Sequence, residues 1–160
     1  LMNVGGVRAS LNAEKYGEGP GEITFAEAFD IAPFGNVFVA LDLTGAQLEQ
    51  VLEQQYVATR SRQKLALGVS EGFTYTWDDV TNPAAPFVVP GSMKLNGVEI
   101  KDTDIVRVGT LNFLADGGDG FTAFKLGTNR VGASGDLEGL VEYFKANPGL
   151  TAPEDRIAGL

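Results

Sequence analysis

The most informative segment of the chain is Leu111-Asn112-Phe113-Leu114-Ala115-Asp116-Gly117-Gly118-Asp119-Gly120-Phe121. Residues 104–111 before it are rich in β-branched side chains and predict a strand, and residues 121–126 after it predict another. Glycine permits positive φ and the close approach of a ligand, and aspartate accepts hydrogen bonds from hydroxyls or amides. Two interpretations follow: a plain connection with Phe113 packed inward, or a ligand site at a strand end. A calcium loop is disfavoured, because the aspartate spacing does not match the twelve-residue pattern with its terminal Glu.

Composition narrows the chemistry that this chain can perform. It has 160 residues, 44% of them hydrophobic, as expected for one globular domain spanning residues 1–160. It contains no cysteine and no histidine, which excludes thiol chemistry, disulfides and a Ser-His-Asp triad within this chain. The formal net charge of −9 disfavours nucleic acid as a partner, so a small anionic ligand would need a local arginine. No apolar run approaches eighteen residues, so we expect no membrane insertion.

Two capping boxes mark the starts of helices. Thr24 is followed three residues later by Glu27, and this pair predicts a short helix to about residue 30. Thr44 and Gln47 repeat the pattern and open a helix whose apolar face is predicted to carry Leu48, Val51, Leu52, Gln55 and Tyr56. A last helix is predicted from about residue 134 to residue 146, where Asn147-Pro148-Gly149 ends it.

The predicted strands are interleaved with these helices. Residues 37–43 are nearly all apolar, which predicts a strand covered on both faces. Residues 73–77 alternate aromatic side chains with threonine, as in a half-buried strand, and Asn96-Gly97 predicts a type I′ hairpin within residues 93–100. We therefore predict an α+β (mixed α/β) fold with helices packed on a mixed β-sheet.

The remaining segments are predicted loops. Residues 12–21 form a polar, glycine-rich loop, and residues 153–160 form a tail. Three basic residues gather within residues 59–64, and the interpretations are a solvated loop or a contact with a partner or ligand: Arg60, Arg62 and Lys64.

Taken together, several motifs resemble one known family. They occur in the family's order and spacing, from about residue 2 to residue 157: Asn3-Val4-Gly5-Gly6-Val7-Arg8, Ile23-Thr24, Pro33-Phe34-Gly35-Asn36, Leu43-Thr44-Gly45 with Leu52-Glu53, and Asn112-Phe113-Leu114-Ala115-Asp116-Gly117-Gly118-Asp119-Gly120-Phe121. The pattern resembles the C-terminal, substrate-binding domain of the 5′-nucleotidase family. That family includes periplasmic, cell-surface and secreted enzymes, among them UDP-sugar hydrolases and cyclic-phosphodiesterase relatives.

The resemblance implies one half of a two-domain phosphoric ester hydrolase. In the family, an N-terminal calcineurin-like metallophosphoesterase domain holds two divalent metal ions of the zinc or manganese type and carries out the hydrolysis. The C-terminal domain binds the nucleoside part of a nucleotide or nucleotide sugar. The catalytic domain and the opening segment of the C-terminal domain are expected to lie outside this chain, so the isolated chain should carry no metal cofactor and no hydrolase activity.

The resemblance also assigns roles to six residues. Phe34 and Phe113 match the two aromatic residues that sandwich the base, and Asp119 matches the residue that accepts hydrogen bonds from the ribose hydroxyls. Arg8 matches the arginine on the ribose-phosphate side, and the polar residues near base and sugar are matched by Asn3 and Asn36.

A second class of function stays open at this point. The domain could be a non-catalytic ligand-binding module at a cell surface or in a secreted protein, either a degenerate nucleotidase or a carbohydrate-binding domain. An upstream metallophosphoesterase domain would separate the two classes.

Overall fold

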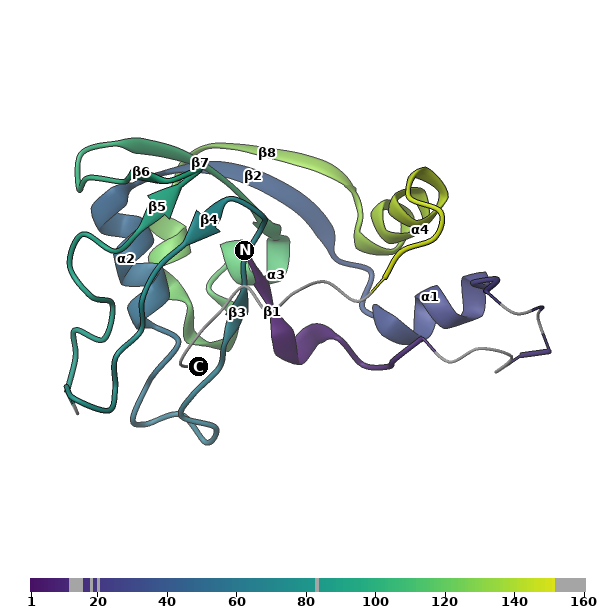
Figure 1. Cartoon of the computed structure of the whole chain (residues 1–160), viewed down its shortest axis with the longest axis horizontal. Helices are drawn as coiled ribbons and strands as arrows, with labels where there is room; N and C mark the ends of the chain where they lie inside the picture. The colour runs from purple at the N-terminus through teal and green to yellow at the C-terminus, as the bar shows by residue number, and fades with distance from the viewer. Residues whose placement is uncertain (12–15, 18, 20, 83, 152–160) are drawn as a thin grey trace.

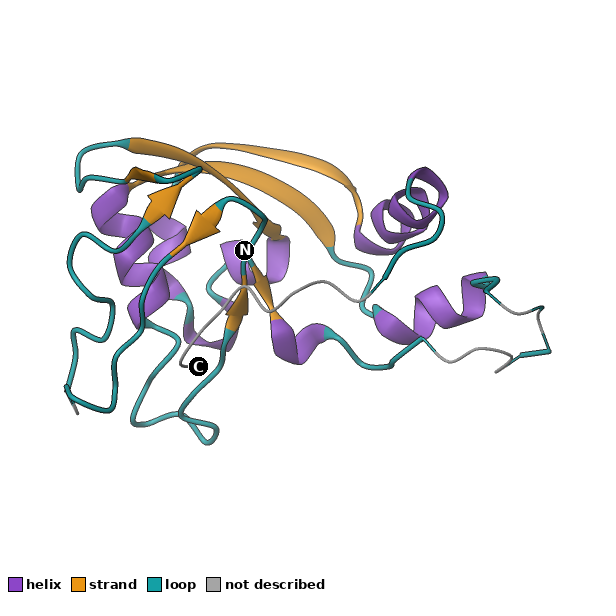
Figure 2. Ribbon diagram, in the orientation of Figure 1, coloured by secondary structure: helices purple, strands orange, loops and turns teal. Residues whose placement is uncertain are grey.

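A computed structural model describes residues 1–11, 16–17, 19, 21–82 and 84–151. The predicted tail at residues 153–160 lies outside these residues, as does much of the predicted loop at residues 12–21. The structure has an α+β, mixed α/β fold with several small antiparallel sheets, which confirms the predicted class (Figures 1 and 2).

The central sheet has the strand order β7-β2-β8, with β2 (Val37–Thr44) between β7 (Ile105–Leu111) and β8 (Thr128–Gly135). Both neighbours run antiparallel to β2, and Phe38 pairs with Leu111 at one end of the β2–β7 ladder. This register places the turn that precedes β2 beside the segment that follows β7. In Figure 1 the three strands arch over the molecule.

Smaller strand pairs complete the sheet structure. β1 (Met2–Asn3) pairs with β3 (Leu67–Gly68), and β4 (Phe73–Thr74), β5 (Lys94–Leu95) and β6 (Val98–Glu99) form a second three-stranded sheet. Asn96 and Gly97 have φ values of 51° and 80°, which confirms the predicted hairpin because a type I′ turn needs positive φ at both positions.

Both capping boxes are present. The Thr24 hydroxyl accepts from the Glu27 N–H at the start of α1 (Phe25–Ile31), and the Thr44 hydroxyl accepts from the Gln47 N–H at the start of α2 (Gly45–Glu53). α3 (Asn112–Ala115) follows β7 directly, and α4 (Asp136–Ala146) follows β8. Three 3₁₀ turns join these elements: η1 (Val4–Gly6), η2 (Gly118–Gly120) and η3 (Thr122–Leu126).

The core lies between α2 and one face of the central sheet. Most of its fully buried side chains come from β2, α2, α3 and η3, namely Leu41, Leu43, Leu48, Val51, Leu52, Leu114 and Phe124. α1 and α4 lie apart from this core. They contact each other beyond the edge of the sheet where β2 begins and β8 ends (Figures 1 and 2).

Three sequence predictions about these elements are wrong. Residues 122–126 form a 3₁₀ turn with Phe121 as its N-cap rather than a strand, because Phe121 and Phe124 are both buried. A spacing of three puts two side chains on the same side of a 3₁₀ turn but on opposite faces of a strand. The strand β8 lacks an apolar alternation and was not predicted.

The other two wrong predictions concern the faces of β2 and α2. In β2 only Val39, Leu41 and Leu43 are buried, while the intervening residues are half-exposed, so one face of the strand is covered rather than both. Helix α2 ends at Glu53, and Tyr56 beyond it is 36% exposed rather than part of the buried face.

Candidate functional site

The structure brings together two turns that are far apart in the sequence. The backbone N–H of Val37 donates to Oδ1 of Asn112 at 2.8 Å, which ties the start of β2 to the start of α3. Phe34 lies three residues before that bond and Phe113 lies one residue after it. These two residues are 49% and 40% exposed, so neither belongs to the core.

All six predicted site residues line one cavity of about 520 Å³: Asn3, Arg8, Phe34, Asn36, Phe113 and Asp119. Leu65 and Leu111 add apolar surface to the same cavity. This volume lies within the range typical of small-molecule sites, which combine apolar walls with a few converging polar groups.

The ring of Phe113 packs against the backbone of Gly118. A Cβ atom at residue 118 would lie 2.6 Å from two carbon atoms of that ring, so any larger residue there would have to displace it. The ring is therefore supported from the glycine-rich turn and also lines the cavity. The simple interpretation with Phe113 packed inward does not describe this arrangement.

Arg8 lies beside Phe34 because of a backbone contact. Its N–H donates to the carbonyl oxygen of Ile31 at the end of α1, at 3.0 Å. The Arg8 guanidinium carbon then lies 4.9 Å from the centroid of the Phe34 ring, a cation–π distance. One face of the Phe34 ring is thus already in contact with a flat cation.

The two aspartates of the glycine-rich segment have different partners. Asp116 forms an ion pair with Arg130 on β8 at 2.6 Å, and this hydrogen bond holds the pKa of the Asp116 carboxyl below its usual value. Asp119 lines the cavity instead. Its φ of 54° is a left-handed conformation that only a few non-glycine residues adopt.

The two predicted asparagines also contribute polar groups. Oδ1 of Asn3 is buried and has no hydrogen-bond partner among the described residues. A buried acceptor without a partner is costly, so a ligand donor here would be favourable. The carbonyl oxygen of Asn36 accepts from the N–H of Asp136 at 2.8 Å, which joins this turn to the start of α4.

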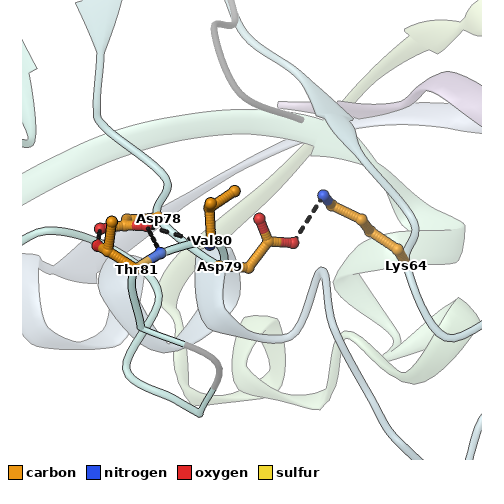
Figure 3. Close-up of polar contacts among 5 residues, drawn as sticks. All are labelled: Lys64, Asp78, Asp79, Val80 and Thr81. Carbon is orange, nitrogen blue, oxygen red and sulfur yellow. Dashed lines mark hydrogen bonds and ion pairs between the residues drawn. The ribbon is translucent and has the colours of Figure 1, made fainter.

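Three further charged residues that sequence reasoning did not assign to the cavity also line it: Arg60, Arg62 and Asp136. Arg60 and Arg62 belong to the basic segment 59–64, and their charge was the signal. Lys64 has a different environment, since it forms an ion pair with Asp79 at 2.9 Å (Figure 3). In the same loop, the Asp78 carboxylate accepts hydrogen bonds from the N–H groups of Val80 and Thr81. Nothing in the sequence marked Asp136, which is 3% exposed and accepts from the N–H of Leu137 at 2.8 Å.

This arrangement suits a ligand with a flat ring and an anionic group. Aromatic faces bind flat rings, asparagine amides both donate and accept, and a carboxylate accepts from hydroxyls. The arginines place positive charge at the cavity of a chain whose net charge is −9. Their planar guanidinium groups suit phosphate oxygens.

Two further features are absent from the described residues. No group of three or more acidic side chains there could hold a metal ion, so the metals implied by the resemblance have no ligand set in that part of the chain. No described helix is both long enough and apolar enough to cross a membrane. A second hollow of about 730 Å³ lies between α1 and α4, and none of the predicted site residues lines it.

Comparison with known proteins identifies the family. Residues 1–126 match the family model of the 5′-nucleotidase C-terminal domain. The chain is 32% identical over 145 residues to the cell wall protein Lmo0130 of Listeria monocytogenes, with 91% of this chain and 18% of that protein covered. It is 34% identical over 149 residues to the endonuclease YhcR of Bacillus subtilis, covering 91% of this chain and 11% of that protein.

Solved structures agree with these relatives. The 5′-nucleotidase precursor from Thermus thermophilus superposes with a TM-score of 0.74 and 30% identity, over 98% of this chain and 30% of that one. The NAD nucleotidase of Haemophilus influenzae gives a TM-score of 0.66 at 25% identity, over 82% of this chain and 26% of that one. The chain thus spans less than a third of the length of these relatives. It belongs to the 5′-nucleotidase family and corresponds to the family's C-terminal domain.

Proposed function

We propose that this domain binds the nucleoside part of a nucleotide or nucleotide sugar for a 5′-nucleotidase-type phosphoric ester hydrolase. The observation that carries the proposal is the single cavity in which Phe34, Phe113, Asp119 and Arg8 meet from three separate segments of the chain. The base would lie between the two partly exposed phenylalanine side chains, because aromatic rings stack on any base.

The sugar and phosphate would lie toward the charged residues. Asp119 would accept hydrogen bonds from the ribose hydroxyls, and a carboxylate acceptor makes those bonds charge-assisted. Arg8 would face the phosphate side, with Asn3 and Asn36 near the base and sugar. Hydrolysis would take place in an N-terminal metallophosphoesterase domain of the same protein, which would hold two divalent metal ions.

The proposed location is the periplasm, the cell surface or the extracellular space. A relative described as a cell wall protein supports this proposal.

A ligand panel tests the proposal against a carbohydrate-binding module. The chain is titrated by calorimetry with AMP, UMP, UDP-glucose and glucose 1-phosphate. We expect the three nucleotides to bind and the sugar phosphate, which has no base, to bind at least tenfold more weakly, the effect of losing about 1.4 kcal/mol of binding free energy. Equal affinities for glucose 1-phosphate and AMP would contradict a base-binding site.

A further inference from the structure

Arg60 makes an unusual number of contacts for a residue in a basic loop. Among the described residues, its guanidinium group donates to backbone carbonyl oxygens alone: Nη2 to those of Gln54, Gln55 and Gln63 at 3.0, 2.9 and 3.0 Å, and Nη1 to that of Asp119 at 2.5 Å. The solvated-loop interpretation of this residue is therefore wrong. Arg60 instead links the end of α2 to the glycine-rich turn.

The hydrogen bonds of Arg60 satisfy backbone groups both at the end of α2 and in the glycine-rich turn. The carbonyls of Gln54 and Gln55 lie just beyond the last residue of α2, where helical carbonyls lack intrahelical partners. Arginine near a helix C-terminus satisfies such carbonyls and interacts favourably with the helix dipole. On the other side, Asp119 is held at φ 54° and is followed by Gly120 at φ 84°, outside any strand or α-helix.

The end of α2 also fixes the segment that follows the turn. Oε1 of Gln54 accepts from the N–H of Ala123 at 2.9 Å, and its Nε2 donates to the hydroxyl of Thr122 at 2.9 Å. Arg60 thus attaches Asp119 to the end of α2, and Gln54 attaches η3, the segment that follows Asp119 in the chain. Because Leu52 in the last turn of α2 is fully buried, both attachments start from a rigid element.

The surroundings of Arg60 keep its side chain in this position. Its guanidinium carbon lies 5.5 Å from the centroid of the buried Phe121 ring. Burial lowers the pKa of the Arg60 guanidinium, and the nearby Asp119 carboxylate acts in the opposite direction. The group stays a cation at neutral pH, because an arginine titrates far above it.

We propose that Arg60 is a positioning residue for Asp119. It holds the Asp119 main chain in the left-handed conformation in which the carboxylate meets the ribose hydroxyls. This inference rests on the proposed function and adds a determinant of ribose selectivity that needs no contact between Arg60 and the ribose. Lysine cannot replace it, since an ammonium group lacks the planar fork that reaches several carbonyls at once.

The test compares AMP with 2′,3′-dideoxy-AMP in calorimetric titrations of the whole chain. We expect Arg60→Ala to weaken AMP binding about tenfold, which corresponds to one lost charge-assisted contact, and to weaken dideoxy-AMP binding less than twofold. Arg60→Lys should give a similar loss of selectivity. Arg62→Ala is the matched control: it removes the same charge from the cavity, and we expect equal losses for both ligands.

Three further results decide the inference. In the Asp119→Ala background, Arg60→Ala should cause no additional loss of ribose selectivity, because the two residues act as one unit. Equal losses for both ligands, or retained selectivity in folded Arg60→Ala and Arg60→Lys proteins, would show that Arg60 is only structural. Failure of the wild-type chain to bind AMP at all would overturn the proposed function and this inference together. Thermal unfolding of each variant establishes that it is folded, and Arg60→Lys provides the answer if the alanine variant is not.

Discussion

The side-chain oxygen of Asn112 accepts a hydrogen bond from the backbone N–H of Val37 at 2.8 Å. The two residues are separated by 75 positions in the sequence and belong to the starts of α3 and β2. This bond and the adjacent pairing of Phe38 with Leu111 fix the distance between the turn of Phe34 and the helix of Phe113. We therefore expect the geometry of the cavity to depend on a polar contact outside it.

Replacing Asn112 should therefore change stability and ligand binding together. We expect Asn112→Ala to lower the free energy of unfolding by about 0.5–1.5 kcal/mol, the net contribution of one hydrogen bond, because water reaches the partly exposed Val37. Urea unfolding measures that loss, and calorimetry should show weaker AMP binding. Asn112→Asp retains an acceptor oxygen and is the control. Unchanged AMP affinity in the alanine variant would mean that the cavity does not depend on this bond.

Leu52→Ala tests the core beneath the site. Leu52 is fully buried in the last turn of α2, so the variant leaves a cavity and should lose about 2–5 kcal/mol of stability. Gln50→Ala on the exposed side of the same helix should stay within about 0.5 kcal/mol of the wild type. A loss below about 1 kcal/mol for Leu52→Ala in urea unfolding would contradict the packing of α2 on the sheet.

The features that were predictable from the sequence are those with local causes. Each capping box is formed within four consecutive residues, and the Asn96-Gly97 turn depends on two. The strand β8 could not be predicted in this way, because its exposed residues become a strand only by pairing with β2. Tertiary pairing of this kind overrides local propensity.

The candidate site also divides into residues that the sequence could indicate and residues that only the tertiary structure reveals. The family resemblance supplied its six residues, and the structure places all of them at one cavity. The resemblance could not supply the positioning role of Arg60, because the contacts of that side chain are with backbone carbonyls at residues 54, 55, 63 and 119. Backbone carbonyls are present at every residue, so no side-chain pattern marks such an interaction.

We expect the isolated chain to release no phosphate from AMP. The sequence has no histidine, and no described group of acidic residues could form a two-metal ligand set. The measurement is phosphate release from AMP in the presence of manganese, with a two-domain 5′-nucleotidase as the positive control. Release above the blank that persists through repurification would show that the chain itself is catalytic.

Phe113→Ala should weaken nucleotide binding without changing base preference. Stacking on a ring contributes on the order of 1–3 kcal/mol per base and tolerates any base. We therefore expect similar losses for AMP, UMP and GMP in calorimetric titrations. Phe25→Ala is a matched control, since this ring is 66% exposed on α1 and lines the other hollow. Losses confined to one base would point to a specific polar contact rather than to stacking.

Asp119→Ala should instead change the preference for the sugar. The carboxylate would accept hydrogen bonds from the ribose hydroxyls, and a bond to a charged group contributes about 1.5–3 kcal/mol. AMP should lose that amount on substitution, while 2′,3′-dideoxy-AMP, which has no hydroxyl to donate, should lose little. Asp116→Ala removes an aspartate of the same segment that is paired with Arg130 instead, and it should leave the ratio of the two affinities unchanged. If Asp119→Ala weakened both ligands equally, the carboxylate would act on the phosphate side or on the fold rather than on the ribose.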